Sequence, residues 1–225
     1  MVEIVPAIIA RGIEEVKKKL ALIEGAAQWA QIDVMDGVFT PPVTFSEPAA
    51  LRDSITTVRL EAHLMVAHPE NIIDAWLDSP VSRIVLHYES TTPEKLKELI
   101  EKINSAGKEA GIALKLETPV SVLDEFLKAK CYKLKAVQLM GIDEIGYHGH
   151  PFDERVLQKA RALHAGYPDV ILAVDGGVNL ENAIKILEAG VSYLVVGSAI
   201  FTSDNVKEAI RKFQSVILKA NYAIS

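Results

Sequence analysis

Acidic and imidazole side chains at the ends of strand-like runs are the residues of this sequence best suited to chemistry. In the run Gln31–Gly37, residue polarity alternates until the turn signal Asp36-Gly37. This pattern predicts a short strand with Asp33 near its carboxyl end. A carboxylate there is costly to bury unless it is paired, hydrogen-bonded or bound to metal, and in a barrel of parallel strands this end carries the chemistry. Asp33 is therefore a candidate functional residue, whereas Asp36 better suits a turn acid that hydrogen-bonds the following loop.

Polar residues, glycines and methionines lie at or near the carboxyl ends of this run and of other strand-like runs. These are Gln31, His63, His87, Glu89, Asp175-Gly176-Gly177 and Gly197-Ser198, with Met35, Met65 and Met140 at similar ends. Two aspartates and a histidine that reach one space from three strands fit a divalent metal site of Zn, Mn or Fe type. The glycines after the last two strands match the usual phosphate position of a parallel barrel. Taken singly, the histidine could be a core residue, the methionines gap fillers and the glycines tight turns.

Strand-like and helix-like segments alternate along the whole chain. The predicted strands are Val2–Ala10, the run around Asp33, Val58–Val66, Arg83–Tyr88, Gly111–Leu116, Leu134–Met140, Val170–Asp175 and Ser192–Val196. The predicted helices are Ile13–Ile23, Pro48–Ser54, Asn71–Leu77, a segment capped by Thr92 that stops near Gly107, a segment capped by Ser121, Asp153–Gly166, Asn179–Ala189 and a last helix from about Ser203.

Eight such units most simply close into a (β/α)₈ barrel, because strands joined through helices run parallel with right-handed crossovers. The alternative is an open doubly wound sheet, which usually has a Gly-rich turn after its first strand. Here that turn is Ala10-Arg11-Gly12, with one glycine. The prediction is an α/β fold, a (β/α)₈ TIM barrel that spans residues 1–225 as one domain.

The composition of the chain limits the kinds of partner that the protein is expected to bind. The chain has 225 residues and a net charge of −6, which argues against nucleic acid because phosphate binding needs clustered Lys and Arg. Cys131 is the only cysteine, so an intramolecular disulfide and a thiolate metal cage are excluded. No stretch approaches the ~20 apolar residues of a membrane span. We expect a cytoplasmic protein that acts on a small molecule. Barrels of this size often associate through helix faces, so a homo-oligomer is also considered.

The sequence resembles the ribulose-phosphate 3-epimerase family over nearly its whole length. The segments that carry the resemblance are Ile32-Asp-Val-Met-Asp-Gly-Val-Phe39, His63-Leu-Met65 with Pro69, Gly111-Ile-Ala-Leu, Thr118-Pro119, Val174-Asp-Gly-Gly-Val-Asn179 and Val196-Gly-Ser-Ala-Ile-Phe201. The resemblance implies a TIM barrel of the ribulose-phosphate-binding type. It also implies a metal-assisted proton transfer at C3 of a pentulose 5-phosphate, most simply D-ribulose 5-phosphate to D-xylulose 5-phosphate. Such a reaction belongs to carbohydrate metabolism and the pentose phosphate pathway.

The resemblance also implies roles for individual residues. In that family the equivalents of Asp33 and Asp175 bind the metal (Zn, Fe, Mn or Co) and act as acid and base on opposite faces of the substrate. His63 is the implied imidazole ligand. Independently, removing a proton beside a ketone builds negative charge on oxygen, and an adjacent cation lowers that barrier. The pocket would be formed by Ala7, Met35, Met65 and Met140, with phosphate near Gly176, Gly177, Gly197 and Ser198.

Three positions depart from the family pattern. Gln31 replaces a histidine ligand, and a Gln oxygen is a weaker donor for Zn-type metals. Ala7 replaces a serine near the substrate. The Gly-rich loop after the sixth strand is replaced by Gly141–Phe152, which carries His148 and His150. These histidines could replace the lost imidazole as metal ligands or phosphate donors, or the loop could be a polar surface loop.

Two other functions remain open from the sequence. One is a different phosphosugar isomerase, epimerase or lyase on the same barrel, which would use the altered loop for another substrate. The other is a barrel that has lost catalysis and only binds a ligand. Retention of both Asp33 and Asp175 argues against the second, because an unused pair of converging carboxylates destabilises a fold by repulsion. Lys115 is also ambiguous: it could pair with Glu117 or Glu61, or provide a cation at the mouth of the barrel.

Overall fold

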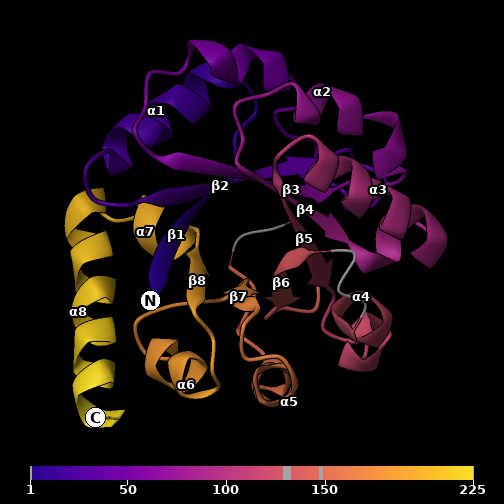
Figure 1. Ribbon diagram of the computed structural model, residues 1–225. Helices are drawn as coiled ribbons and strands as arrows, with labels where there is room; N and C mark the ends of the chain where they lie inside the picture. Colours follow the sequence, from indigo (N-terminus) through magenta and orange to yellow (C-terminus); the bar gives the residue numbers. More distant parts are fainter. Residues whose placement is uncertain (1, 129–132, 147–148, 225) are drawn as a thin grey trace.

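The computed structural model describes residues 2–128, 133–146 and 149–224 and has the predicted closed barrel. Its eight strands are all parallel and follow one another in chain order around the barrel, with β1 paired to β8 (Figure 1). The strands are β1 (Glu3–Ile8), β2 (Trp29–Met35), β3 (Arg59–Met65), β4 (Arg83–His87), β5 (Glu109–Leu114), β6 (Leu134–Met140), β7 (Ile171–Asp175) and β8 (Tyr193–Val196). The barrel prediction is confirmed.

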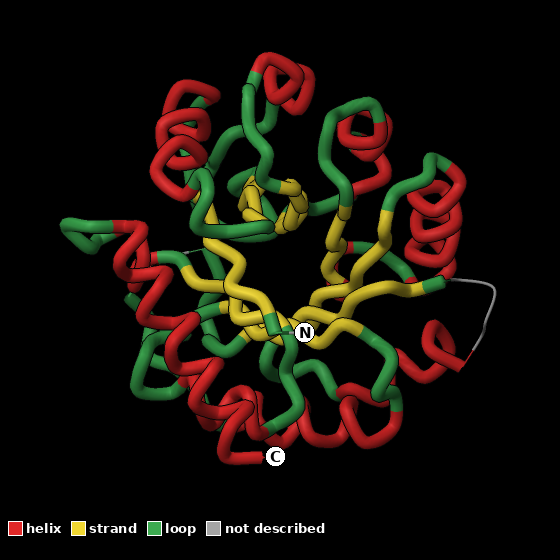
Figure 2. Tube along the Cα trace, turned by 60° about the vertical axis from the view of Figure 1, so that its left-hand side comes forward, coloured by secondary structure: helices red, strands yellow, loops and turns green. Residues whose placement is uncertain are grey.

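Helices form the outer ring around the strands (Figure 2). They are α1 (Ile13–Ile23), α2 (Ile73–Leu77), α3 (Pro93–Ser105), α4 (Asp124–Lys128), α5 (Arg155–Gly166), α6 (Ala183–Glu188), α7 (Ser198–Phe201) and α8 (Val206–Ile224). Short 3₁₀ turns lie at Pro48–Asp53, Pro69–Asn71, Tyr88–Ser90 and Val120–Leu123. Within the described ranges, every helix is too short or too polar to cross a bilayer.

Helix α3 begins and ends where its sequence predicts. The Thr92 side chain accepts a hydrogen bond from the Lys95 backbone N–H, and Pro93 occupies the first turn. The four apolar residues of the stripe are all buried against the barrel: Leu96, Leu99, Ile100 and Ile103. Gly107 follows the helix with φ 74°, a conformation that favours glycine.

Several predicted boundaries are wrong, and the reasons are local. Ser121 does not cap a helix, because it lies inside the 3₁₀ turn that precedes α4. The segment Pro48–Ser54 is a 3₁₀ turn rather than an α-helix. The fifth strand ends at Leu114 rather than Leu116. Beyond this point, the backbone oxygens of Lys115 and Leu116 accept hydrogen bonds from Lys159 Nζ.

Two further helix predictions also need correction. The segment predicted as Asn179–Ala189 is helical only over Ala183–Glu188, because Asn179 Oδ1 accepts from the backbone N–H groups of Glu181 and Asn182 in a turn that precedes the helix. The segment predicted as Asn71–Leu77 is split between a 3₁₀ turn and α2. Cys131, the single cysteine on which the exclusion of a disulfide rests, lies outside the described residues.

The pairing register of β2 and β3 sets the position of the functional side chains. Gln31 lies opposite Glu61, Asp33 opposite His63, and Met35 opposite Met65. The intervening residues of both strands are apolar and pack outward in the main core. Because side chains alternate along a strand, the six paired residues all face the barrel interior.

A cluster of charged side chains occupies the opposite, amino-terminal end of the barrel interior. The Arg83 guanidinium donates to Glu61 Oε2 (2.8 Å) and Glu109 Oε2 (2.6 Å) and lies 4.3 Å from the centre of the Trp29 ring. Arg83 and Glu61 are almost completely buried. Burial raises the pKa of Glu61, and the nearby Arg83 opposes that shift. The charge of Arg83 therefore stabilises a carboxylate that has no access to water.

We predict that Arg83→Met lowers the free energy of unfolding by about 3–5 kcal/mol, because it leaves the buried Glu61 carboxylate unpaired. Urea titration followed by circular dichroism measures the effect. Arg59→Met is the control, since Arg59 is half-exposed and also pairs with Glu109 (3.5 Å). It should cost less than about 1 kcal/mol. Equal losses in the two variants would contradict a special role for the buried pair.

Candidate active site

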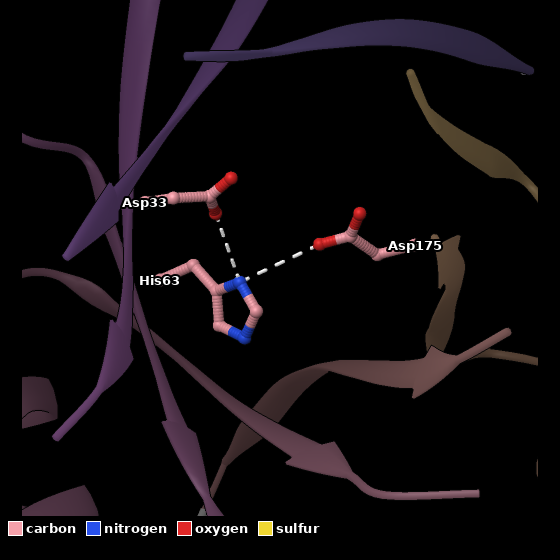
Figure 3. A group of neighbouring side chains, drawn as sticks. All are labelled: Asp33, His63 and Asp175. Atoms are coloured by element: carbon pink, nitrogen blue, oxygen red, sulfur yellow. Dashed lines mark hydrogen bonds and ion pairs between the residues drawn. The ribbon is translucent and has the colours of Figure 1, made fainter. Parts of the chain in front are cut away.

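Asp33, His63 and Asp175 converge at the carboxyl-terminal end of the barrel from β2, β3 and β7. His63 Nδ1 lies 3.1 Å from Asp33 Oδ1 and 3.4 Å from Asp175 Oδ2. Figure 3 shows the two carboxylates approaching the imidazole from different sides. One ligand atom from each residue lies within 4.8 Å of the others, and all three residues are buried. The three strand ends therefore bring a potential metal site together.

A cavity of about 300 Å³ opens above this group. Asp33 and Asp175 both line it, so the two carboxylates face one space rather than separate surfaces. The other lining residues are Ala7, Ile9, Met65, Met140, Ile142, Gly146, Gly149, His150, Gly176, Gly177, Val178, Asn179, Val195, Gly197, Ser198, Ala199 and Thr202. Its volume lies at the lower end of the range of about 300–1,000 Å³ typical of small-molecule sites.

The structure brings most of the sequence-predicted site residues to this cavity. Met35 is the exception among the pocket residues: it lies beside the cavity, in a buried cluster with Met65, Met140, Ile142 and Ile145. His148 lies outside the described residues. His150 lines the cavity but is not part of the Asp33–His63–Asp175 group.

The two glycines after β7 are needed for close packing as well as for the turn. Gly176 has φ 101° and Gly177 has φ 69°, both in the region that favours glycine. A Cβ on Gly176 would lie 2.7 Å from the Ile142 side chain, and one on Gly177 would lie 2.8 Å from the Phe152 backbone. The turn that faces the cavity therefore also accommodates the Gly141–Phe152 loop.

That loop is anchored against the opposite side of the mouth as well. Thr40 Oγ1 donates to the Ile145 backbone oxygen (2.7 Å), and a Cβ on Gly146 would collide with the same hydroxyl. Ile142 and Ile145 are buried. At these points the loop is a packed wall of the cavity rather than a purely polar surface loop.

Sequence reasoning missed Gln138, which reaches the same group from β6. Its Nε2 donates to Asp175 Oδ2 (2.8 Å) and lies 3.2 Å from His63 Nδ1. Gln31 Nε2 donates to both Asp33 Oδ1 and Asp175 Oδ2 at 2.7 Å. The signal that could have identified Gln138 is its position two residues before Met140, which places both side chains on the inner face of the strand.

His87 and Glu89 form a hydrogen-bonded chain that orients His63. His63 Nε2 lies 2.9 Å from His87 Nε2, and His87 Nδ1 lies 3.2 Å from Glu89 Oε2. Glu89 also accepts from the Lys115 backbone N–H and from the Thr118 hydroxyl. Because the Glu89 carboxylate holds a proton on His87 Nδ1, His87 Nε2 must accept from His63 Nε2. Nδ1 of His63 is thereby directed at the two aspartates.

Burial and charge shift the pKa values of these groups in opposite directions. Burial raises the pKa of Asp33, and the hydrogen bond with His63 opposes this. Burial would lower the pKa of His63, but its contacts with Asp175 and Asp33 raise it to about 9. Burial lowers the pKa of His87 to about 4. A protonated His63 therefore supplies the positive charge between the two aspartates, while His87 is neutral.

The donor atoms fit a divalent metal ion. Asp33, His63 and Asp175 offer two carboxylate oxygens and one imidazole nitrogen, a set that binds Zn²⁺, Mn²⁺ and Fe²⁺. Gln31 Oε1 is buried and has no hydrogen-bond partner in the part of the chain that the structure describes. An orphaned buried oxygen beside this group is consistent with a ligand atom that is satisfied by a cation.

Lys115 does not pair with either carboxylate considered from the sequence. Its Nζ lies 4.1 Å from the centre of the Phe39 ring, whereas Glu61 pairs with Arg83 and Glu117 pairs with Arg155. Of the alternatives that the sequence leaves open, the structure does not show the ion pair, and both acids have arginine partners.

Glu89→Gln should lower the free energy of unfolding at neutral pH and should lower it much less in acid. Burial acts to raise the pKa of the Glu89 carboxyl. Hydrogen bonds from His87, Thr118 and the Lys115 backbone outweigh this effect and lower the pKa to about 2 from its usual 4.5. Its contribution, about 2 kcal/mol, is complete above about pH 4.5 and is lost as the pH falls towards 2. Urea midpoints at pH 7 and pH 3 measure this difference. Glu117→Gln, at an exposed site, is the control. Equal losses of stability in Glu89→Gln at pH 7 and pH 3 would refute a stabilising role for the ionised Glu89 carboxylate.

Comparisons with known proteins agree with this geometry. The sequence profile of the ribulose-phosphate 3 epimerase family matches residues 3–201. The ribulose-phosphate 3-epimerase of Schizosaccharomyces pombe is 32% identical, over 97% of this chain and 95% of that protein. The Bacillus subtilis protein of the same name is 31% identical, over 95% and 99% of the two chains. The Synechocystis protein is 34% identical, over 88% and 84%.

Solved structures of other enzymes share the fold. The 3-hexulose-6-phosphate synthase of Salmonella typhimurium superposes with a TM-score of 0.75 at 14% identity, covering 97% of this chain and 99% of that one. KGPDC of Streptococcus mutans superposes with a TM-score of 0.72 at 15% identity, covering 98% and 99%. Identities this low support the fold alone. The extended matches in sequence decide the family: the chain belongs to the ribulose-phosphate 3-epimerase family.

Proposed function

We propose that this protein is a metal-dependent epimerase that interconverts D-ribulose 5-phosphate and D-xylulose 5-phosphate by proton transfer at C3. One observation carries the proposal: Asp33 and Asp175 reach a common cavity from β2 and β7, with His63 between them. Inversion of a carbon centre requires one proton-transferring group on each face of the substrate. Membership of the ribulose-phosphate 3-epimerase family supports the same reaction.

The two aspartates are suited to opposite roles in proton transfer. One carboxylate removes the C3 proton from its face, and the other carboxylic acid delivers a proton to the opposite face. Burial raises the pKa of Asp33, which favours the protonated form needed for an acid. Reversal of the reaction exchanges the two roles.

Asp33, His63 and Asp175 would hold the metal ion, with Gln31 beside them. When bound, the ion supplies positive charge close to the oxygen on which negative charge develops. The Glu89–His87 chain keeps the His63 ring in place. Met65, Met140 and Ile142 line the cavity with apolar surface, which limits the access of water to the reacting carbon.

The phosphate group of the substrate would lie near the turns after β7 and β8. Gly176, Gly177, Gly197 and Ser198 line the same cavity as the two aspartates. Small residues allow an anion to approach the backbone N–H groups of such turns. His150 lines the cavity as well and, among the described residues of the Gly141–Phe152 loop, is an imidazole in a position to contact the substrate.

A second candidate is epimerisation, isomerisation or cleavage of a different phosphosugar at the same site. The observation that favours it is the loop itself, which presents Ile142 and His150 to the cavity and is fixed by Thr40. A changed wall alters which sugar fits, while the chemistry of the two aspartates is retained. A coupled assay with ketose phosphates of five and six carbons separates the two candidates.

Asp175→Asn should reduce turnover of D-ribulose 5-phosphate by about 10²–10⁴-fold without unfolding the protein, because one face of the substrate loses its proton-transferring group. A coupled xylulose 5-phosphate assay measures turnover, and circular dichroism checks folding. Asp143→Asn is the control, since Asp143 is exposed and pairs with Arg155. Undiminished turnover in Asp175→Asn would refute the two-base mechanism.

His150→Asn should raise the KM for the phosphosugar about tenfold with a smaller change in kcat, because a residue that contacts the substrate away from the reacting carbon contributes to uniform binding. Steady-state kinetics at several substrate concentrations separate the two constants. His68→Asn, at a side chain that is 72% exposed, is the control. An unchanged KM in His150→Asn would exclude His150 from substrate binding.

A further inference from the structure

Two glutamine side chains enter the Asp33–His63–Asp175 group from opposite parts of the barrel. Gln31 projects from β2 and Gln138 from β6, and both are almost completely buried. Each Nε2 lies 3.2 Å from His63 Nδ1, and the two lie 2.7 Å and 2.8 Å from Asp175 Oδ2. Both amide groups therefore surround the same small volume as the three residues already described.

The orientation of an amide group follows its surroundings, because its oxygen and nitrogen have nearly the same shape. With two carboxylates and no metal ion between them, the NH₂ group faces the carboxylate oxygens. The Gln31 oxygen is then turned away and, although buried, is left without a partner among the described residues, which costs free energy. A cation between the aspartates reverses this preference, since an amide oxygen coordinates a cation and an NH₂ group cannot.

We infer that Gln31 and Gln138 are both metal ligands through their side-chain oxygens, so that the site is rich in oxygen donors. With Asp33, His63 and Asp175, the set contains four oxygens and one nitrogen. Carboxylate and carbonyl oxygens suit Mn²⁺ and Mg²⁺, whereas imidazole suits Zn²⁺. The site therefore favours a hard divalent cation more than a site with a second imidazole would. The inference rests on the proposed function and deepens it, since it names the class of metal that serves the same site.

Metal affinity measured without substrate tests the inference independently of turnover. The full-length protein is stripped with EDTA; Mn²⁺ binding is followed by the loss of the free-ion electron paramagnetic resonance signal, and Zn²⁺ binding by competition with a chromophoric chelator. Gln138→Leu should raise the Kd for Mn²⁺ about tenfold and the Kd for Zn²⁺ less than about threefold, because Zn²⁺ is satisfied by four ligands. Gln158→Leu, at an exposed position of α5, is the matched control and should change neither.

Gln31→His should act in the opposite direction, tightening Zn²⁺ about tenfold more than Mn²⁺, because it replaces an oxygen donor by an imidazole. Circular dichroism checks the fold of every variant, and Gln138→Met, which keeps the length of the side chain, repeats the test if Gln138→Leu does not fold. Equal loss of Mn²⁺ and Zn²⁺ in the Gln138 variants would mean that the amide only donates to Asp175. Failure of the wild-type protein to bind Mn²⁺ at millimolar concentration would mean that the two amides replace a metal.

These outcomes are distinct from failure of the proposed function. A protein that binds Mn²⁺ as expected but does not turn over any pentulose phosphate would retain the inferred ligand set and lose the proposed reaction. A protein that turns over substrate but shows equal losses of the two metals would retain the reaction and lose the inferred ligand set.

Discussion

Two buried carboxylates that share one small volume impose the main constraint on this structure. Asp33 and Asp175 cannot both remain ionised in a low dielectric unless positive charge or hydrogen-bond donors lie between them. His63 provides a proton at Nδ1, and Gln31 and Gln138 provide amide N–H groups. The same arrangement is compatible with a divalent cation, which would displace the proton and reverse the amides.

The interactions that stabilise the two aspartates extend well beyond the residues in contact with them. Glu89 holds His87, His87 holds His63, and the backbone after β5 holds Glu89. A carboxylate at the rim of the barrel thereby determines the orientation of an imidazole at its centre. At the opposite end of the barrel, Arg83 balances Glu61 and Glu109 in a separate ionic cluster. Charges inside the barrel are therefore balanced locally at each end.

Periodicity and turn chemistry predict the barrel, the strand ends and the convergence of Asp33, His63 and Asp175. These features depend on local alternation of residues, which is written directly in the sequence. Gln138 is not predicted: its spacing from Met140 places it on the inner face of the strand, but its contacts with Asp175 and His63 depend on strands that are distant in sequence. The helix start assigned to Ser121 fails for a related reason: its side chain is suited to capping, but the chain there forms a 3₁₀ turn before α4. Likewise, the packing of Ile142 and Ile145 depends on contacts between segments that are distant in sequence.

The close approach of Phe152 to Gly177, and of Ile142 to Gly176, has a consequence for how this protein can diverge. Neither glycine can acquire a side chain while the loop keeps its present path, and the loop cannot be exchanged for a bulkier one while the turn stays as it is. The two segments must therefore change in concert during descent. Substrate preference in this lineage would shift by joint replacement of a turn and a loop, while the acids beneath them stay unchanged.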